Sequence, residues 1–304
     1  MIDINFDKNT NLYEDYEQCI KFLKVIEEVE EKEFTYPDEV VKFHVYSEIK
    51  TPKELMVIKS YLATQNLDKT EMIVWSDYDI TDNKLIEPYK NYITFKVYDP
   101  ELEAEGTPLE GNVKLKMRDP KYYLQSDLAR ILLLYKYGGI WVDMDVILLR
   151  DFKPILDQEY MYMWGSETDF EREGACATVL SGKSKSEFMA ELIKQLIQTD
   201  ARPGTTCWGK DMFAALYKRY TFNVLPAGFF NIEWCINKKH PGLGDKIESQ
   251  WFIKHLENKE HLFLESFGWH WHNSSKKDFE VVQGSKFDIL EKLTDKRLKE
   301  KGIL

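Results

Sequence analysis

The chain has 304 residues, of which 43% are hydrophobic and 14% are aromatic. This length and composition allow one large α/β domain with a sizeable core, and they argue against a disordered chain. The formal net charge is −11, and no block of lysine and arginine stands out. A surface that follows the phosphates of a nucleic acid is therefore not expected.

The cysteines and the N-terminal residues indicate in which part of the cell the protein is expected. The four cysteines are far apart and form no Cys-x-x-Cys pair, so they predict neither a zinc site nor a disulfide framework. The first residues are acidic and polar, unlike a signal peptide, and no apolar run approaches the ~20 residues of a membrane span. We therefore expect a cytoplasmic protein without a membrane span.

Helix and strand signals alternate along the first half of the chain. Apolar residues between Tyr13 and Glu33 recur at helical spacing among many charged residues, and Pro37 then marks a break. We expect residues 1–36 to form a peripheral helical addition. The next elements predicted are a buried strand over residues 40–47, a helix over 52–65 and a second strand over 71–77.

A third helix and strand follow. Asp119-Pro120 is typical of a helix start, and the apolar spacing predicts that the helix runs to Tyr137. Gly138-Gly139 predicts its end, before a strand over residues 140–149. Helices are also expected over residues 186–198 and 211–220. This alternation favours a mostly parallel sheet, which places ligands beyond the carboxyl ends of its strands.

Two carboxylates stand in this third strand, at Asp143 and Asp145. Period-two alternation would place both on one side, where they repel each other and lose solvation unless a cation lies nearby. Mn²⁺ or Mg²⁺ fits, because such ions prefer oxygen ligands and bridge carboxylates to substrate phosphates. The alternative is that the two residues end the strand in a solvated turn.

The segment Ser126–Val146 closely resembles the DXD-containing region of family 32 glycosyltransferases, the yeast-type initiating mannosyltransferases, and of related toxin glucosyltransferase domains. The family pattern is S-D-x-x-R, a helix, Y-x-x-G-G-x-Y and D-x-D. It stands here as Ser126, Asp127, Arg130, Tyr135, Gly138, Gly139, Trp141, Asp143 and Asp145. Trp141 replaces the family tyrosine and keeps an aromatic ring.

Weaker matches extend the resemblance over most of residues 39–276. They are Trp75 and Asp77 at the end of the second strand, Leu225, Pro226 and Phe230 in a late L-P-x-x-x-F segment, and His270, Asn273, Ser274 and Ser275 near the end. His272 stands where the family has tryptophan, and a shifted register would pair Trp271 with that position. The sequence therefore leaves open whether His270 or His272 takes the role of the family histidine.

The resemblance implies a glycosyltransferase-A type fold, that is, a Rossmann-like, mostly parallel sheet flanked by helices, over residues 37–276. Residues 277–304 would form a tail packed on this core. It also implies the reaction: transfer of a sugar from a UDP- or GDP-sugar to a saccharide or other hydroxyl acceptor, with a Mn²⁺ or Mg²⁺ ion and with retention at the anomeric carbon.

Roles for individual residues follow from the same resemblance. The metal would be held by Asp143, Asp145 and His270. The donor would contact Trp75, Asp77, Asp127, Arg130, Asp143 and Ser274, and the residues closest to catalysis would be Asp127, Arg130 and Asp145. The pattern around Glu167 departs from the family, so Glu167, Asp169 and Asp211 are only candidates for acceptor or sugar contacts.

Each role has a structural alternative. Asp127 and Arg130 could form a simple i,i+3 ion pair, Trp75 could be a core residue, and His270 could be a packed, hydrogen-bonded histidine. Two other functions also remain open. VDMDV resembles the nucleophile loop of haloacid-dehalogenase-type phosphatases, although that loop usually opens its domain, and a non-catalytic nucleotide-sugar binder could keep the cation site.

Overall fold

The computed structural model describes residues 25–120, 122–163, 175–231, 252, 255–256, 259–273 and 280–304. The elements of the first half are β1 (Val41–Tyr46), α2 (Pro52–Thr64), β2 (Thr70–Ser76), β3 (Thr94–Val97), α3 (Pro100–Ala104), η1 (Val113–Lys116), α4 (Tyr123–Tyr137), β4 (Gly139–Val142) and β5 (Val146–Leu148). Those of the second half are η2 (Lys153–Ile155), β6 (Tyr160–Met163), β7 (Ala175–Gly182), α6 (Glu187–Gln198), α7 (Lys210–Tyr217), β8 (Val224–Leu225), η3 (Ala227–Phe229), η5 (Lys259–Leu262), β9 (Gly268–His270) and α11 (Lys286–Glu300).

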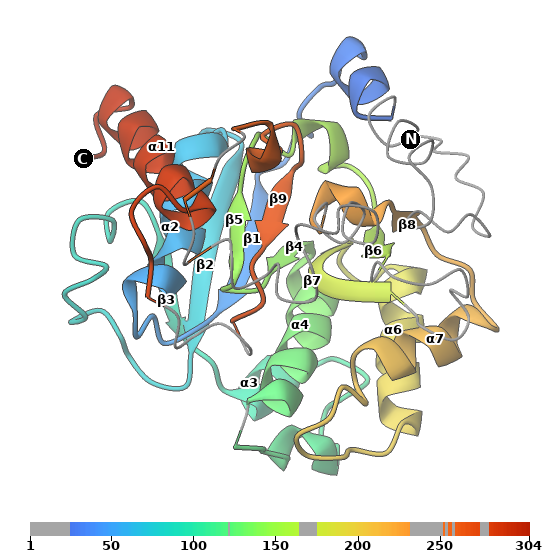
Figure 1. The fold of residues 1–304 in the computed structure, drawn as a ribbon. Helices are drawn as coiled ribbons and strands as arrows, with labels where there is room; N and C mark the ends of the chain where they lie inside the picture. The colour runs from blue at the N-terminus through green and yellow to red at the C-terminus, as the bar shows by residue number, and fades with distance from the viewer. Residues whose placement is uncertain are drawn as a thin grey trace.

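The main sheet has the strand order β3-β2-β1-β4-β7-β6-β8 (Figure 1). Strands β3, β2, β1 and β4 run parallel to one another, whereas β7 runs antiparallel to both β4 and β6. A second, two-stranded sheet pairs β5 with β9. The expected architecture, a mostly parallel α/β sheet flanked by helices, is confirmed.

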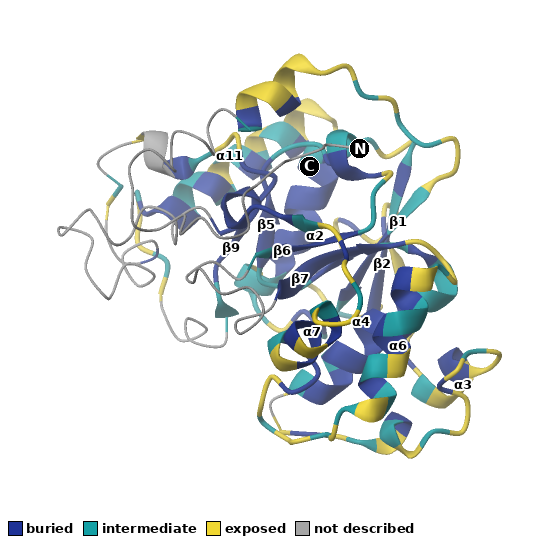
Figure 2. Ribbon diagram, turned by 90° about the vertical axis from the view of Figure 1, so that its right-hand side faces the viewer, coloured by how far each residue is buried: buried dark blue, intermediate teal, exposed yellow. Residues whose placement is uncertain are grey.

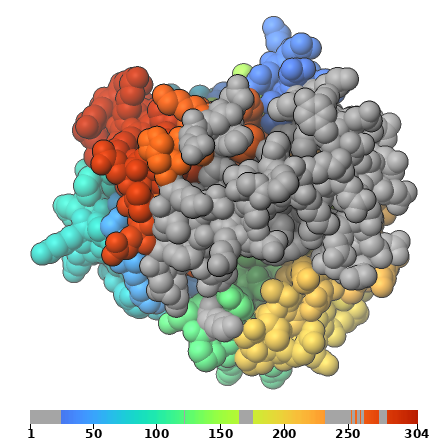
Figure 3. All heavy atoms as spheres, viewed as in Figure 1, coloured from blue at the N-terminus to red at the C-terminus, as the bar shows by residue number. Residues whose placement is uncertain are grey.

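Alternation along the strands sends apolar side chains to two cores. Met72 and Val74 of β2 face a core shared with α2, whereas Ile73 and Trp75 face a core shared with α4, α6 and α7. Strands β2, β4, β6 and β7 are mostly buried, whereas β3 at the edge of the sheet is mostly exposed. The outer face of α6 is also exposed (Figure 2). In the space-filling view, the red surface of α11 and the yellow surface around α6 lie at opposite corners of one face (Figure 3).

The described residues near both ends of the chain pack close to helix α2. Residues 25–31 are helical, and Ile26 and Val29 are buried in the core beside α2, while residues 1–24 lie outside the described part. At the other end, Lys59 of α2 forms ion pairs with Glu291 and Asp295 of α11. The domain boundaries at residues 36 and 276 remain a prediction.

Helix α4 begins later than expected. It starts at Tyr123 rather than at Asp119-Pro120, after Tyr122 with φ 62°. The Asp119 carboxylate accepts a hydrogen bond from Leu124 N (2.7 Å), so it caps the helix from outside instead of beginning it. The expected end at Tyr137 is confirmed, because Gly138 adopts φ 67° as the C-cap.

The expected single strand over residues 140–149 is wrong, because the chain turns at the two aspartates. Strand β4 ends at Val142, Val146 N donates to Asp143 O (3.1 Å), and β5 enters the second sheet. The preceding Gly139 has φ 105°, and a Cβ there would lie 2.2 Å from Lys42 O of β1. Only glycine permits this close approach.

We predict that His44 makes stability depend on pH. Its ring is buried between Trp75 Nε1 (3.1 Å to Nδ1) and Gly138 O (3.0 Å to Nε2), and this burial lowers its pKa from 6.5 to about 4. As the pH falls below 6.5, the unfolded state takes up the proton first, so stability is full above pH 6.5 and is lost toward pH 4.

The test is urea denaturation of the wild type and His44→Gln at several pH values. Between pH 7 and pH 4, the wild type should lose about 3 kcal/mol more than the variant. The comparison must be between the two proteins, because Asp127, with a pKa raised to about 6 by burial, acts in the opposite direction over the same range. Parallel stability curves would contradict the prediction.

Candidate active site

Two cavities meet at the turn that carries the two aspartates. The first has a volume of about 480 Å³ and the second about 260 Å³. Both are lined by Tyr123, Ser126, Asp143 and Asp145. The turn follows the carboxyl end of β4, where a mostly parallel sheet is expected to bind ligands.

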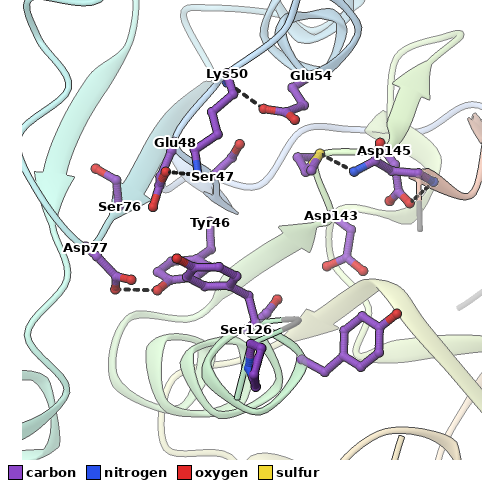
Figure 4. A pocket seen from close by; sticks show the side chains of 15 residues that line it. Tyr46, Ser47, Glu48, Lys50, Glu54, Ser76, Asp77, Ser126, Asp143 and Asp145 are labelled. Carbon is purple, nitrogen blue, oxygen red and sulfur yellow. Dashed lines mark hydrogen bonds and ion pairs between the residues drawn. The ribbon is translucent and has the colours of Figure 1, made fainter. Parts of the chain in front are cut away.

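The first cavity lies beyond the carboxyl ends of β1 and β2. Tyr46 Oη donates to Asp77 Oδ1 (2.5 Å) on one side, and Asp143 and Asp145 lie on the opposite side (Figure 4). The ring of Tyr122 also lines this cavity and is 45% exposed. Carboxylates and hydroxyls therefore surround a space with an aromatic ring at its edge.

Asp143 is held by two donors. Arg130 Nη2 lies 3.0 Å from Asp143 Oδ1 and 3.2 Å from Oδ2, and Trp141 Nε1 donates to Oδ1 at 2.5 Å. Burial raises the pKa of Asp143, and the Arg130 charge works in the opposite direction. The Trp141 indole thus supplies a donor to this aspartate.

Asp127 and Arg130 form a buried ion pair. Arg130 Nη1 lies 3.3 Å from Asp127 Oδ1, and the two residues are 6% and 9% exposed. Burial raises the pKa of Asp127 to about 6, although Arg130 opposes the shift. The guanidinium therefore lies between two carboxylates, Asp127 and Asp143, and both line the second cavity.

Asp145 is bound by the segment around β9. Its Oδ2 accepts from Asn273 N (2.8 Å) and lies 3.4 Å from His270 Nε2. Burial acts to raise the pKa of Asp145, but the interactions with His270 and Asn273 outweigh it and lower the pKa to about 2. This carboxylate is ionised at neutral pH.

Both histidines lie close to Asp145. His270 Nε2 lies 3.4 Å from Asp145 Oδ2, and the His272 ring lies against the His270 ring with centroids 3.8 Å apart. Both rings line the second cavity, and both act to lower the pKa of Asp145. The choice of His270 as the metal ligand remains a prediction.

Some of the other expected site residues do not line either cavity. The Trp75 side chain is buried beside His44 and lines neither cavity, which favours the alternative that it is a core residue. Asp211 pairs with Arg202 (3.3 Å) and also lines neither cavity. Ser274, Glu167 and Asp169 lie outside the described residues.

The side chains at the turn could act as ligands for a hard divalent cation. Asp145 stays ionised, Asp143 lies on the same turn, and carboxylate oxygens are the ligands that Mg²⁺ and Mn²⁺ prefer. Among the described residues, no three His, Cys, Asp or Glu side chains are grouped so that they could hold a metal ion as they stand. The oxygen ligands of Asp143 and Asp145 therefore suit such a cation, although both carboxylates are hydrogen-bonded to protein groups in this structure.

Residues 52–162 match the model of a family described as "Glycosyltransferase sugar-binding region containing DXD motif". The matched range runs from the start of α2 into β6 and includes Asp127, Arg130, Asp143 and Asp145. The match bears out the expected enzyme class, a glycosyltransferase. In the described part of the chain, no helix is long and apolar enough to cross a membrane.

An Arabidopsis thaliana protein, described as "Uncharacterized protein At4g19900", is 25% identical over 205 residues, which are 62% of this chain and 30% of that protein. The chain thus spans well under half of that relative's length.

Among solved structures, the apo-form glycosyltransferase GlyE of Streptococcus pneumoniae TIGR4 is 12% identical, with 86% of this chain and 63% of GlyE covered and a TM-score of 0.49. An active-site mutant of LgtC is 12% identical, with 83% and 95% covered and a TM-score of 0.44. The PaToxG glycosyltransferase is 16% identical, with 70% and 78% covered and a TM-score of 0.41. With TM-scores below 0.5, these likenesses carry no weight for the activity of this chain.

We predict that removing the Arg130 charge destabilises the folded protein. In Arg130→Leu, the buried Asp127 and the partly buried Asp143 lose their cation, so the free energy of unfolding should fall by about 3 kcal/mol in urea denaturation at pH 7. The double variant Arg130→Leu/Asp127→Asn should recover part of this loss, because one of the two charges is gone. A loss below about 1 kcal/mol, as for an exposed pair, would refute the description of a buried triad.

Proposed function

We propose that this chain is a metal-dependent glycosyltransferase that uses a UDP- or GDP-sugar donor and transfers the sugar, with retention, to a saccharide or other hydroxyl acceptor. The supporting observation is that the D-x-D turn lies between two cavities at the carboxyl side of the sheet, within the segment that matches the glycosyltransferase family model. We also propose, on the motif resemblance, that it belongs with the family 32 group.

In this proposal the two cavities divide the donor between them. The nucleoside would occupy the first, where the Asp77 carboxylate can accept from ribose hydroxyls and the exposed Tyr122 ring can pack against a base. The sugar would occupy the second, where Asp127 and Arg130 lie. Trp75 is left out, because its side chain is buried in the core.

The diphosphate would lie at the turn shared by both cavities. Asp143, Asp145 and His270 would hold a Mn²⁺ or Mg²⁺ ion, which when bound neutralises the diphosphate and stabilises the negative charge that grows on it as the glycosidic bond breaks. Arg130 adds a fixed positive charge beside Asp143 and can donate to a sugar or phosphate oxygen. Burial of these groups strengthens each of the charge interactions.

We predict that activity requires the cation and Asp145. The assay is release of nucleoside diphosphate from UDP- and GDP-sugars, with or without a hydroxyl acceptor. EDTA should abolish release, and Mn²⁺ or Mg²⁺ should restore it. Asp145→Asn should lower kcat/KM by at least ~100-fold, equivalent to about 2.7 kcal/mol, with the fold retained.

A matched control is Asp157→Asn, since Asp157 is an exposed carboxylate paired with Lys183 outside both cavities. This variant should keep wild-type activity. Full activity of Asp145→Asn would refute the assignment of the turn as the cation site.

The same assay separates the alternatives from the sequence. Release of inorganic phosphate from a phosphate monoester, without turnover of nucleotide sugars, would favour the haloacid-dehalogenase-type phosphatase. Binding of nucleotide sugars without turnover, measured as a rise in melting temperature, would favour the non-catalytic binder.

A further inference from the structure

A buried hydrogen-bond cluster lies behind His270, on the side of the ring away from Asp145. Its centre is Tyr162 Oη of β6, which lies 3.3 Å from His270 Nδ1, 3.0 Å from Cys176 Sγ and 3.3 Å from Asn231 Nδ2. Tyr162 is fully buried, and Asn231 is 1% exposed. The two nitrogens of His270 therefore face different partners, Tyr162 on one side and Asp145 on the other.

The partners of Tyr162 determine where its proton points. A phenol carries one proton, and the Cys176 thiol and the Asn231 amide both donate to its oxygen. The Thr178 hydroxyl is a further hydrogen-bond neighbour. An imidazole nitrogen is the strongest acceptor in this group, so Tyr162 donates to His270 Nδ1. With Nδ1 as the acceptor, a ring proton lies on Nε2 and points to Asp145.

A cation bound through Nε2 needs the opposite arrangement, because a protonated ring nitrogen has no lone pair for a metal. We propose that Tyr162 is a positioning residue for the cation site: its hydroxyl changes from donor to acceptor, which holds the ring proton on Nδ1 and frees Nε2. This inference rests on the proposed function. Tyr162 and His270 carry two protons in both arrangements, and only their positions differ.

The reversed arrangement requires a new acceptor for the Tyr162 proton. Asn231 Oδ1 is buried and has no hydrogen-bond partner among the described residues. A rotation of the Asn231 amide by 180° would bring Oδ1 to the place now held by Nδ2, 3.3 Å from Tyr162 Oη. Asn231 would then be the terminal acceptor of a relay that runs from His270 through Tyr162. Its Oδ1 would gain a partner, and its Nδ2 would move to the place where Oδ1 now lacks one.

The same strand offers a matched control. Tyr160 is also fully buried on β6, but its hydroxyl has no hydrogen-bond partner within the described part of the chain. Tyr160→Phe and Tyr162→Phe therefore remove the same atom from the same kind of environment. Only the second removes the partner of His270 Nδ1.

The first test measures the dissociation constant of Mn²⁺ alone, by electron paramagnetic resonance of the free ion, for the full chain and its variants. Tyr162→Phe should weaken binding at least ~10-fold, the usual effect of losing the partner that orients a metal-bound histidine. Asn231→Leu should weaken it about fivefold, as for one lost hydrogen bond. Tyr160→Phe should stay within about twofold of the wild type.

The second test follows the His270 tautomer by ¹⁵N NMR of histidine side chains, with the signal assigned from His270→Gln. In the wild type, the proton should lie on Nε2 without metal and move to Nδ1 when Mg²⁺ is added. A change of packing alone would not produce this shift.

The outcomes separate this inference from the proposed function. If Asp145→Asn loses Mn²⁺ but Tyr162→Phe binds it like the wild type, the relay is refuted while the cation site stands. An unchanged His270 tautomer on addition of Mg²⁺ would also refute the relay. If the wild type does not bind Mn²⁺, or Asp145→Asn binds it equally well, both the cation site and the relay are refuted.

Discussion

The site depends on compensation of negative charge at a turn that the fold partly buries. Asp127, Asp143 and Asp145 would repel each other if all were ionised and unpaired in such a place. Arg130 lies between the first two, and His270 faces the third. Helix α4 supplies Arg130 and the second sheet supplies His270, so the packing of both elements around the turn is a condition for the site.

The protein groups that compensate the charge of the aspartates also affect how a cation would bind at the turn. Asp143 and Asp145 already have hydrogen-bond partners here, so a divalent ion has to exchange some of these contacts for its own. The Tyr162 hydroxyl would allow this exchange at His270, because it can either donate to Nδ1 or accept from it and so can bind either tautomer of the ring. The residues around the turn are then arranged for both tautomers of His270, one without the cation and one with it.

Much of the fold could be predicted from the sequence because its signals are local. The apolar runs gave β1 and β2, and the helical spacing and the glycine stop gave α2 and the end of α4. The start of α4 was missed because Asp119 caps it through a side-chain contact that spacing does not reveal. The break between β4 and β5 was missed because the apolar residues on either side of the turn read as one strand.

The same distinction holds for the site. One contiguous motif contains Asp127, Arg130, Asp143 and Asp145, so the sequence predicted them together as site residues. Period-two alternation placed the two aspartates on one face of a strand, whereas the structure shows that they lie in a turn. Tyr46, Tyr122 and Tyr162 were not predicted. Tyr162 is 108 positions from His270, and a contact between two distant strands leaves no pattern in a single sequence.

The most direct measurement of the central claim is calorimetric binding of UDP and GDP with and without Mn²⁺. If the D-x-D turn holds a cation that binds the diphosphate, one of the two nucleotides should bind at least ~10-fold more tightly with Mn²⁺, a gain of about 1.4 kcal/mol. This gain should be absent in Asp145→Asn. Equal affinity with Mn²⁺ and with EDTA, for both nucleotides in the wild type, would contradict the claim.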